Sequence, residues 1–161
     1  MRKLDFNEYK LAQMQARIFE ESIERANFSS PMFIRRFMTS YDAKTIINKS
    51  FLAVSKDTRE VIEDLNDKYQ PSRKSPMYSK NQMYWIGYIF ATLCFLYELS
   101  PKAIYKLFPA KEIVKYYNIY HTFDVEDAAE RMMENINYVK KDYTIEGVKI
   151  LKRLIAEENK I

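Results

Sequence analysis

The side chains of this sequence that could do chemistry are few, and one group of them lies close together in the chain. The single histidine, His121, is followed by Asp124, Glu126 and Asp127 at the start of a predicted helix. A metal site or a His-Asp proton relay would use these residue types. The chain has no second histidine, and acidic residues at a helix N-terminus are also explained by capping. We therefore expect His121 to serve structure or partner contact, and we keep an enzyme built on it as a third hypothesis.

The cysteine and the two glycines exclude other kinds of chemistry. Cys94 is the only cysteine and lies in an apolar segment, where burial keeps a thiol protonated and unreactive. A single cysteine allows no intrachain disulfide and no Cys-rich zinc site, which fits a reducing, cytoplasmic setting. Gly87 and Gly147 stand alone, so no glycine-rich loop can bind a phosphate. The sequence predicts no catalytic residue, no metal site and no cofactor.

Composition and helix signals predict one all-α domain over residues 1–161. Two glycines are too few for the tight turns of an all-β fold, and 47% apolar with 30% charged residues is a globular composition. Helix start signals, either N-cap acceptors or prolines at the first helical position, recur at Asp5, Asp57, Ser79, Asp124, Ser30-Pro31, Ser100-Pro101 and Phe108-Pro109. We expect helices near residues 6–27, 31–39, 42–49, 57–69, 80–99, 101–107, 109–119, 125–138 and 144–158.

The segment from Met83 to Tyr97 is predicted to be the centre of the fold. It is uncharged over fifteen residues and apolar all round, which is typical of a helix in the middle of a bundle. About twenty apolar residues are needed to cross a bilayer, so we expect a core helix and no membrane span. Short connections containing Pro101 and Pro109 predict sharp turns. The expected fold is an irregular orthogonal helical bundle around a central apolar helix at about 80–99, with the last helix laying an apolar stripe on the core.

Tyrosines and a threonine form a row on one face of this central helix. Tyr84, Tyr88 and Thr92 are four residues apart, and Trp85 lies beside them. Apolar and aromatic residues at helical spacing favour burial, with the three hydroxyls satisfied inside the core. The alternative is an aromatic stripe at the surface, of the kind that is enriched in protein interfaces.

Excess positive charge is confined to one predicted loop. Residues 68–80 contain four basic side chains, Arg73 and Lys74 among them, and no acid. The rest of the chain carries 22 basic and 22 acidic residues. Arg35 and Arg36 follow an apolar stretch, so at least one of them should leave the buried side of its helix. There it would be solvated or ion-paired, or it would contact a partner, because arginine is enriched at interfaces.

Nucleic-acid binding is the alternative function that the charges suggest. Helices within residues 101–119 carry four lysines, Lys102, Lys106, Lys111 and Lys115, and the 68–80 loop adds to them. Lys102 and Lys106 are also typical of the polar face of an amphipathic helix. Outside the loop the chain has no surplus charge with which to build an extended phosphate footprint.

Three strings of the sequence resemble one group of proteins. SPMFIRRFM at residues 30–38, MYWIGYIF at residues 83–90 and YHTFDVEDAAER at residues 120–131 are similar, in that order, to small helical proteins of bacterial toxin-antitoxin-type operons. The resemblance covers about residues 30–133. It implies a cytoplasmic antitoxin-like or accessory protein that holds a partner enzyme, encoded nearby, inactive.

We therefore expect a non-enzymatic protein-interaction module that neutralises or regulates a partner enzyme by direct binding. Neither a membrane nor a cofactor is expected to take part, and the oligomeric state is left open. The residues expected to contact the partner are Arg35, Arg36, Arg73, Lys74, Tyr84, Trp85, Tyr88, His121 and Asp124.

Overall fold

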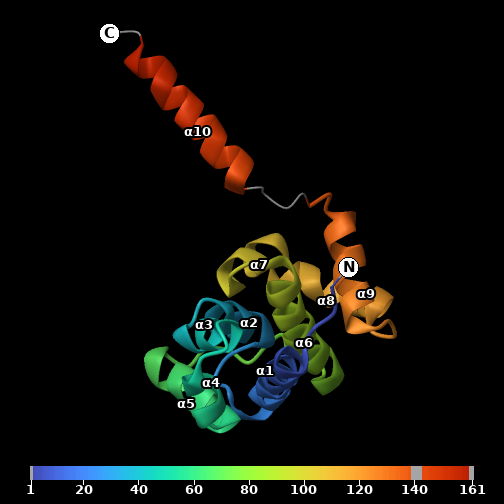
Figure 1. Cartoon of the computed structure of the whole chain (residues 1–161). Helices are drawn as coiled ribbons and strands as arrows, with labels where there is room; N and C mark the ends of the chain where they lie inside the picture. The colour runs from blue at the N-terminus through green and yellow to red at the C-terminus, as the bar shows by residue number, and fades with distance from the viewer. Residues whose placement is uncertain (1, 139–142, 160–161) are drawn as a thin grey trace.

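The structure is a computed structural model that describes residues 2–138 and 143–159 (Figure 1). It confirms the all-α prediction, because these residues form ten helices and no strand. The helices are α1 (Phe6–Arg25), α2 (Ser30–Met38), α3 (Tyr41–Ile47), α4 (Phe51–Ser55), α5 (Thr58–Lys68), α6 (Lys80–Tyr97), α7 (Pro101–Leu107), α8 (Ala110–Tyr120), α9 (Val125–Asn135) and α10 (Tyr143–Glu158).

Local capping explains where the main helices begin. The Asp5 side chain accepts a hydrogen bond from the Glu8 N–H at 2.8 Å, and the Glu8 side chain accepts one from the Asp5 N–H at 3.0 Å. This capping box starts α1, and Ser79 with Gln82 forms a second one at the start of α6. Ser100 caps α7 through its hydroxyl. The predicted N-caps at Asp5, Ser79 and Ser100 are therefore confirmed.

Two helix starts and one short helix differ from the predictions. The cap of α2 is Ser29, whose hydroxyl accepts from the Met32 N–H, so the helix begins one residue before Pro31. Pro109 is itself the N-cap of α8 and not its first residue. The sequence predicts no helix at α4, because five residues are too few to show a helical period.

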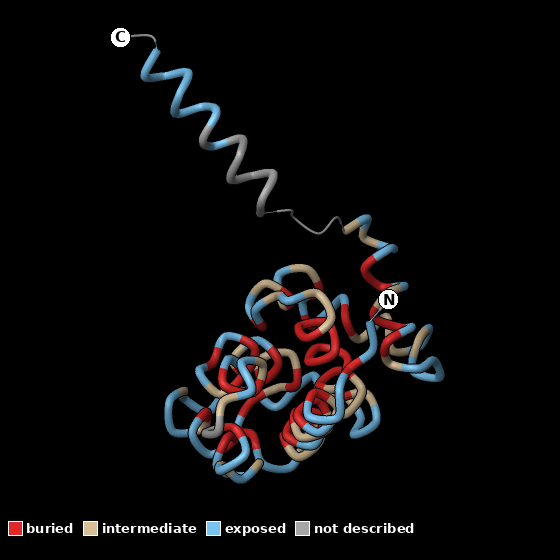
Figure 2. Tube along the Cα trace, viewed as in Figure 1, coloured by how far each residue is buried: buried red, intermediate tan, exposed pale blue. Residues whose placement is uncertain are grey.

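Helix α6 lies at the centre of the body, as predicted. It packs against α1, α3, α7, α8 and α9, and its pairing with α1 is the most extensive in the molecule. Figure 2 shows the buried residues gathered toward the middle of the body. Phe19 of α1 is fully buried, and its ring lies edge-on at 5.0 Å from Phe37, 5.4 Å from Phe33 and 6.4 Å from Phe90. These four rings join α1, α2 and α6.

The closest approach between α1 and α6 is at Gly87. Gln15 Nε2 of α1 donates a hydrogen bond to the Gly87 carbonyl oxygen at 2.9 Å. A Cβ atom added at Gly87 would lie 2.8 Å from Phe19 Cγ and 2.9 Å from the Gln15 carbonyl oxygen. Both distances are well inside van der Waals contact. The absence of a side chain at Gly87 therefore allows the two helices to pack this closely.

No single helix of the described residues has both the length and the hydropathy of a membrane span. Helices α6 and α7 would pass that test only when taken together, and they are bent by 110° relative to each other. The bend is the sharp turn that the connection before Pro101 predicts.

The last helix, α10, does not follow its prediction. Leu154 and Ile155 of the predicted stripe are 53% and 50% exposed, and Figure 1 shows the helix apart from the others. The expected apolar stripe is therefore not laid on the core at these two positions; the side chains of its other members, Ile145, Val148 and Leu151, lie outside the described part of the structure. The chain leaves α9 through Asn137, whose left-handed backbone, with φ at 54°, is a conformation that ends a helix and redirects the chain.

Candidate functional site

An open cleft of about 530 Å³ lies where the first half of α6, the end of α8 and the start of α9 meet. We call it the aromatic cleft. Most of its lining residues carry rings, namely Tyr9, Tyr84, Trp85, Tyr88, Tyr117, His121 and Phe123. The others are Asn81, Asp124, Val125 and Glu126. Tyr9 reaches the cleft from α1, so four helices contribute to it.

The aromatic cleft brings together five of the nine residues expected to contact a partner. Three of them, Tyr84, Trp85 and Tyr88, share one face of α6 because residues three and four apart in a helix are neighbours. The other two, His121 and Asp124, are the C-cap of α8 and the N-cap of α9. The turn between α8 and α9 thus carries His121 and Asp124 to the aromatic face of α6.

The row of hydroxyls on α6 is divided between the core and the cleft. Thr92 is fully buried, and its hydroxyl donates to the Tyr88 carbonyl oxygen at 2.9 Å. Tyr84 and Tyr88 are half-buried and line the cleft, with their ring centroids 6.2 Å apart. Burial, and next the carboxylate of Glu126, raise the pKa of Tyr88. Thr92 therefore lies in the core with its hydroxyl satisfied, whereas Tyr84 and Tyr88 form part of an aromatic surface.

Ring contacts hold the wall that α8 contributes. The Trp85 ring lies edge-on to Tyr117 with 5.8 Å between centroids, and Tyr117 stacks on His121 at 4.5 Å. His121 Nδ1 is 2.7 Å from the Tyr117 carbonyl oxygen. A carbonyl can only accept, so Nδ1 is the donor in this hydrogen bond. Among the described residues no hydrogen bond links His121 to Asp124, so the two do not form a proton relay in this geometry.

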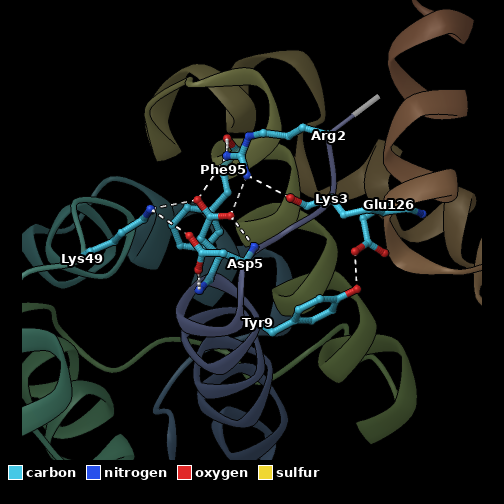
Figure 3. A network of polar contacts seen from close by, with 8 residues as sticks. Arg2, Lys3, Asp5, Tyr9, Lys49, Phe95 and Glu126 are labelled. Atoms are coloured by element: carbon cyan, nitrogen blue, oxygen red, sulfur yellow. Dashed lines mark hydrogen bonds and ion pairs between the residues drawn. The ribbon is translucent and has the colours of Figure 1, made fainter.

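Two carboxylates also line the cleft. Asp124 occupies the N-cap position of α9, but its side chain makes no capping hydrogen bond and is exposed. Capping therefore does not explain this residue. Glu126 is 3% exposed and accepts a hydrogen bond from the Tyr9 hydroxyl, which Figure 3 shows pointing at the carboxylate. The hydrogen bond to Glu126, with burial, raises the pKa of Tyr9 to about 12, so Tyr9 stays a donor at neutral pH.

An ion-pair network around the buried carboxylate of Glu8 fixes the start of α1, the helix that carries Tyr9 (Figure 3). Glu8 is 3% exposed and accepts from Arg2 at 2.7 Å and 3.1 Å and from Lys49 Nζ at 2.9 Å. Arg2 also donates to the Phe95 carbonyl oxygen at 2.6 Å. Burial by itself would raise the pKa of Glu8, but the hydrogen bonds from Arg2 and Lys49 outweigh it and lower the pKa to about 2.

The other four predicted contact residues do not line the aromatic cleft. Arg35, Arg73 and Lys74 are exposed on α2 and in the loop after α5. Arg36 is half-buried, and its guanidinium lies 4.6 Å from the Phe28 ring centroid and 4.4 Å from that of Tyr69 (residue 69 caps α5). Its Nη1 atom is buried without a hydrogen-bond partner among the described residues. Arg36 thus packs between two rings, and Arg35 is the arginine that faces outward.

Replacing Arg36 with lysine should lower the free energy of unfolding by about 1 kcal/mol, because an ammonium cannot stack on two rings as a planar guanidinium does. The measurement is urea denaturation followed by circular dichroism. Arg35→Lys on the exposed side of the same helix is the matched control and should leave the midpoint unchanged. Equal effects of the two replacements would show that the ring contacts of Arg36 add no stability.

The part of the chain that the structure describes contains no group of three His, Cys, Asp or Glu side chains placed to hold a metal ion. Cys94 is 1% exposed in α6, and burial raises the pKa of its thiol. The four lysines of α7 and α8 are exposed, and Lys115 pairs with Glu112 at 3.4 Å. Nucleic-acid binding by these helices stays a prediction.

Sequence reasoning did not predict six lining residues of the cleft as contacts, although it noted Glu126 in the acidic group after His121. They are Tyr9, Asn81, Tyr117, Phe123, Val125 and Glu126. Tyr117 and His121 are four residues apart in the chain, and this helical spacing could have indicated that their rings stack. No local signal connects Tyr9 with Glu126, since 117 positions separate them in the chain. Comparison of the chain with protein-family models, curated proteins and solved structures found no match in any of the three.

Proposed function

We propose that this chain is a non-enzymatic, antitoxin-like interaction protein that binds a partner protein through the aromatic cleft and so holds a partner enzyme inactive. The observation that carries the proposal is the gathering of Tyr84, Trp85, Tyr88, His121 and Asp124 around one open cleft. A few residues carry most of the binding free energy of a protein interface, and tryptophan and tyrosine are enriched among them. The lining of the cleft contains one tryptophan and four tyrosines.

The position of the cleft also supports docking. Four helices contribute to it, its tyrosines and tryptophan are half-buried, and Tyr9, Trp85 and Tyr88 pack against the hydrophobic core. Rings held in this way lose little conformational freedom when a partner binds. A partner segment entering the cleft would therefore gain contact area without ordering its walls.

The test is co-expression with the product of the adjacent gene. The two proteins should copurify, and the chain should relieve growth arrest caused by that product. Trp85→Ala and Asp124→Lys should each weaken binding about tenfold or more, as expected for residues at the centre of an interface. Asp124 is exposed and makes no capping hydrogen bond, so its replacement should leave the fold intact.

The control is the double variant Arg35→Ala, Lys74→Ala, which changes two exposed predicted contact residues outside the cleft. It should bind as the unchanged chain does. Loss of binding in this variant, with binding retained by both cleft variants, would place the partner on α2 and the loop after α5. Failure to copurify and to relieve toxicity would end the proposal.

A further inference from the structure

The charged groups of the aromatic cleft determine the charge of its occupant. Among the described residues, two carboxylates and no lysine or arginine line it. None of the ion pairs in residues 2–138 includes Asp124 or Glu126. The N-terminus of α9 carries a partial positive charge of about half a unit, which offsets only part of the charge of the two carboxylates. A cationic group is therefore favoured over an anionic one.

The rings of the cleft add a second attraction for a cation. The faces of tryptophan and tyrosine rings are electron-rich and attract guanidinium and ammonium groups. The protein itself forms such contacts with arginine at two places. Arg36 lies over Phe28 and Tyr69, and Arg131 lies 5.1 Å from the ring centroid of Phe123, which is a lining residue of the cleft.

The geometry of the acceptors favours a guanidinium over an ammonium. A guanidinium is planar, stacks on rings and carries five N–H donors, so it can meet a ring face and a carboxylate together. Tyr9 already binds Oε1 of Glu126 and fixes the orientation of this buried carboxylate. Asp124, whose side chain is not used in capping, also lines the cleft. The two carboxylates therefore offer acceptors in a cleft that is otherwise lined mainly by rings.

We infer that the aromatic cleft binds the guanidinium group of an arginine side chain presented by the partner protein. The group stacks on the rings of α6 and α8 and donates hydrogen bonds to Asp124 and Glu126. This inference rests on the proposed function and specifies the chemistry of its central contact. The cleft volume of about 530 Å³ lies within the range of ligand pockets, about 300–1,000 Å³.

The test uses two short peptides that differ in one charge, acetyl-Gly-Arg-Gly-amide and its citrulline counterpart. Citrulline keeps the shape of arginine but replaces one nitrogen by a carbonyl oxygen, so the charge is lost. Each peptide is titrated into the full chain and followed by NMR. The arginine peptide should shift the indole N–H signal of Trp85 and the signals of residues 121–126. The citrulline peptide should bind at least about tenfold more weakly, because it loses the cation-π contact and the charge-assisted hydrogen bonds.

A matched pair of variants tests the carboxylate. Asp124→Asn keeps the size of the side chain and removes its charge, and it should weaken the arginine peptide about fivefold to tenfold while leaving the citrulline peptide unchanged. Asp127→Asn is the control, because Asp127 lies on the same helix turn, does not line the cleft and pairs with Lys3 at 3.9 Å. It should bind both peptides as the unchanged chain does.

The outcomes separate this inference from the proposed function. Equal affinity for the two peptides, shifts outside the cleft, or no shifts at all would overturn the arginine contact. If a partner copurifies through Trp85 while the arginine peptide fails to bind, only the present inference is wrong. If the arginine peptide binds in the cleft but no partner copurifies or is neutralised, the proposed function is wrong and the cation site stands.

Discussion

Replacing Gly87 by alanine is expected to lower the free energy of unfolding by about 2 kcal/mol, although alanine is the better helix former by about 1 kcal/mol. The reason is steric. The new Cβ would lie 2.8 Å from Phe19 Cγ and 2.9 Å from the Gln15 carbonyl oxygen, and a backbone atom cannot rotate away. Helices α1 and α6 would have to separate along their most extensive contact. The measurement is urea denaturation of the Gly87→Ala variant and of the unchanged chain at pH 7.

Asn81→Ala is the control for this replacement, because residue 81 is exposed on the same helix. It should be neutral or slightly stabilising, as expected when alanine enters an exposed helical position. A Gly87→Ala protein as stable as the unchanged chain would mean that α1 and α6 are not packed as closely as the structure has them.

Replacing Glu8 by glutamine is expected to destabilise the protein by about 2 kcal/mol at pH 7. A fall in the pKa of Glu8 from 4.5 to about 2 corresponds to about 3 kcal/mol by linkage. The expected loss of unfolding free energy is smaller than this, because Arg2 and Lys49 are 46% and 47% exposed and water weakens their attraction for Glu8. Glutamine keeps the shape and one acceptor oxygen but loses the negative charge between two cations.

The pH dependence of this effect has a definite sign. The pKa of Glu8 is lower in the folded protein than in the unfolded chain, so protonation favours unfolding. The stabilisation is complete above pH 4.5 and is lost as the pH falls toward 2. The difference in unfolding free energy between the unchanged chain and Glu8→Gln should therefore shrink over this interval. Denaturation curves at pH 7, 4 and 2.5 measure it.

Glu24→Gln provides the comparison, because Glu24 is an exposed acid that pairs with Lys80 at 2.7 Å at the surface. Water and salt screen such pairs, so this replacement should leave stability unchanged. A difference between Glu8→Gln and the unchanged chain that persists undiminished at pH 2.5 would show that Glu8 acts through packing and not through its charge.

The sequence predicted the elements of the fold that depend on neighbouring residues. Asp5 with Glu8, and Ser79 with Gln82, are pairs three residues apart, and both form the capping boxes that start α1 and α6. The uncharged segment from Met83 to Tyr97 is the central helix, as its uniform hydrophobicity indicated. The stripe of α10 was misplaced, because a helical period shows which residues share a face but does not show what that face contacts.

The candidate site was predictable only where its residues are local. Tyr84, Trp85 and Tyr88 are close in sequence, and His121 with Asp124 flanks one turn, so each group could be recognised separately. Their meeting in one cleft depends on how α8 and α9 fold back onto α6, which no spacing encodes. Arg36 illustrates the same limit, since its stacking between Phe28 and Tyr69 joins positions far apart in the chain.

The protein has one tryptophan, and it lies in the wall of the aromatic cleft with its ring edge-on to Tyr117. Selective excitation of indole therefore samples this cleft alone, and no dye needs to be attached. Fluorescence from Trp85 should shift to shorter wavelength when a bound segment displaces water from the ring, and to longer wavelength when the helices melt. Because the two emission shifts have opposite signs, a single sample would distinguish binding in the cleft from unfolding.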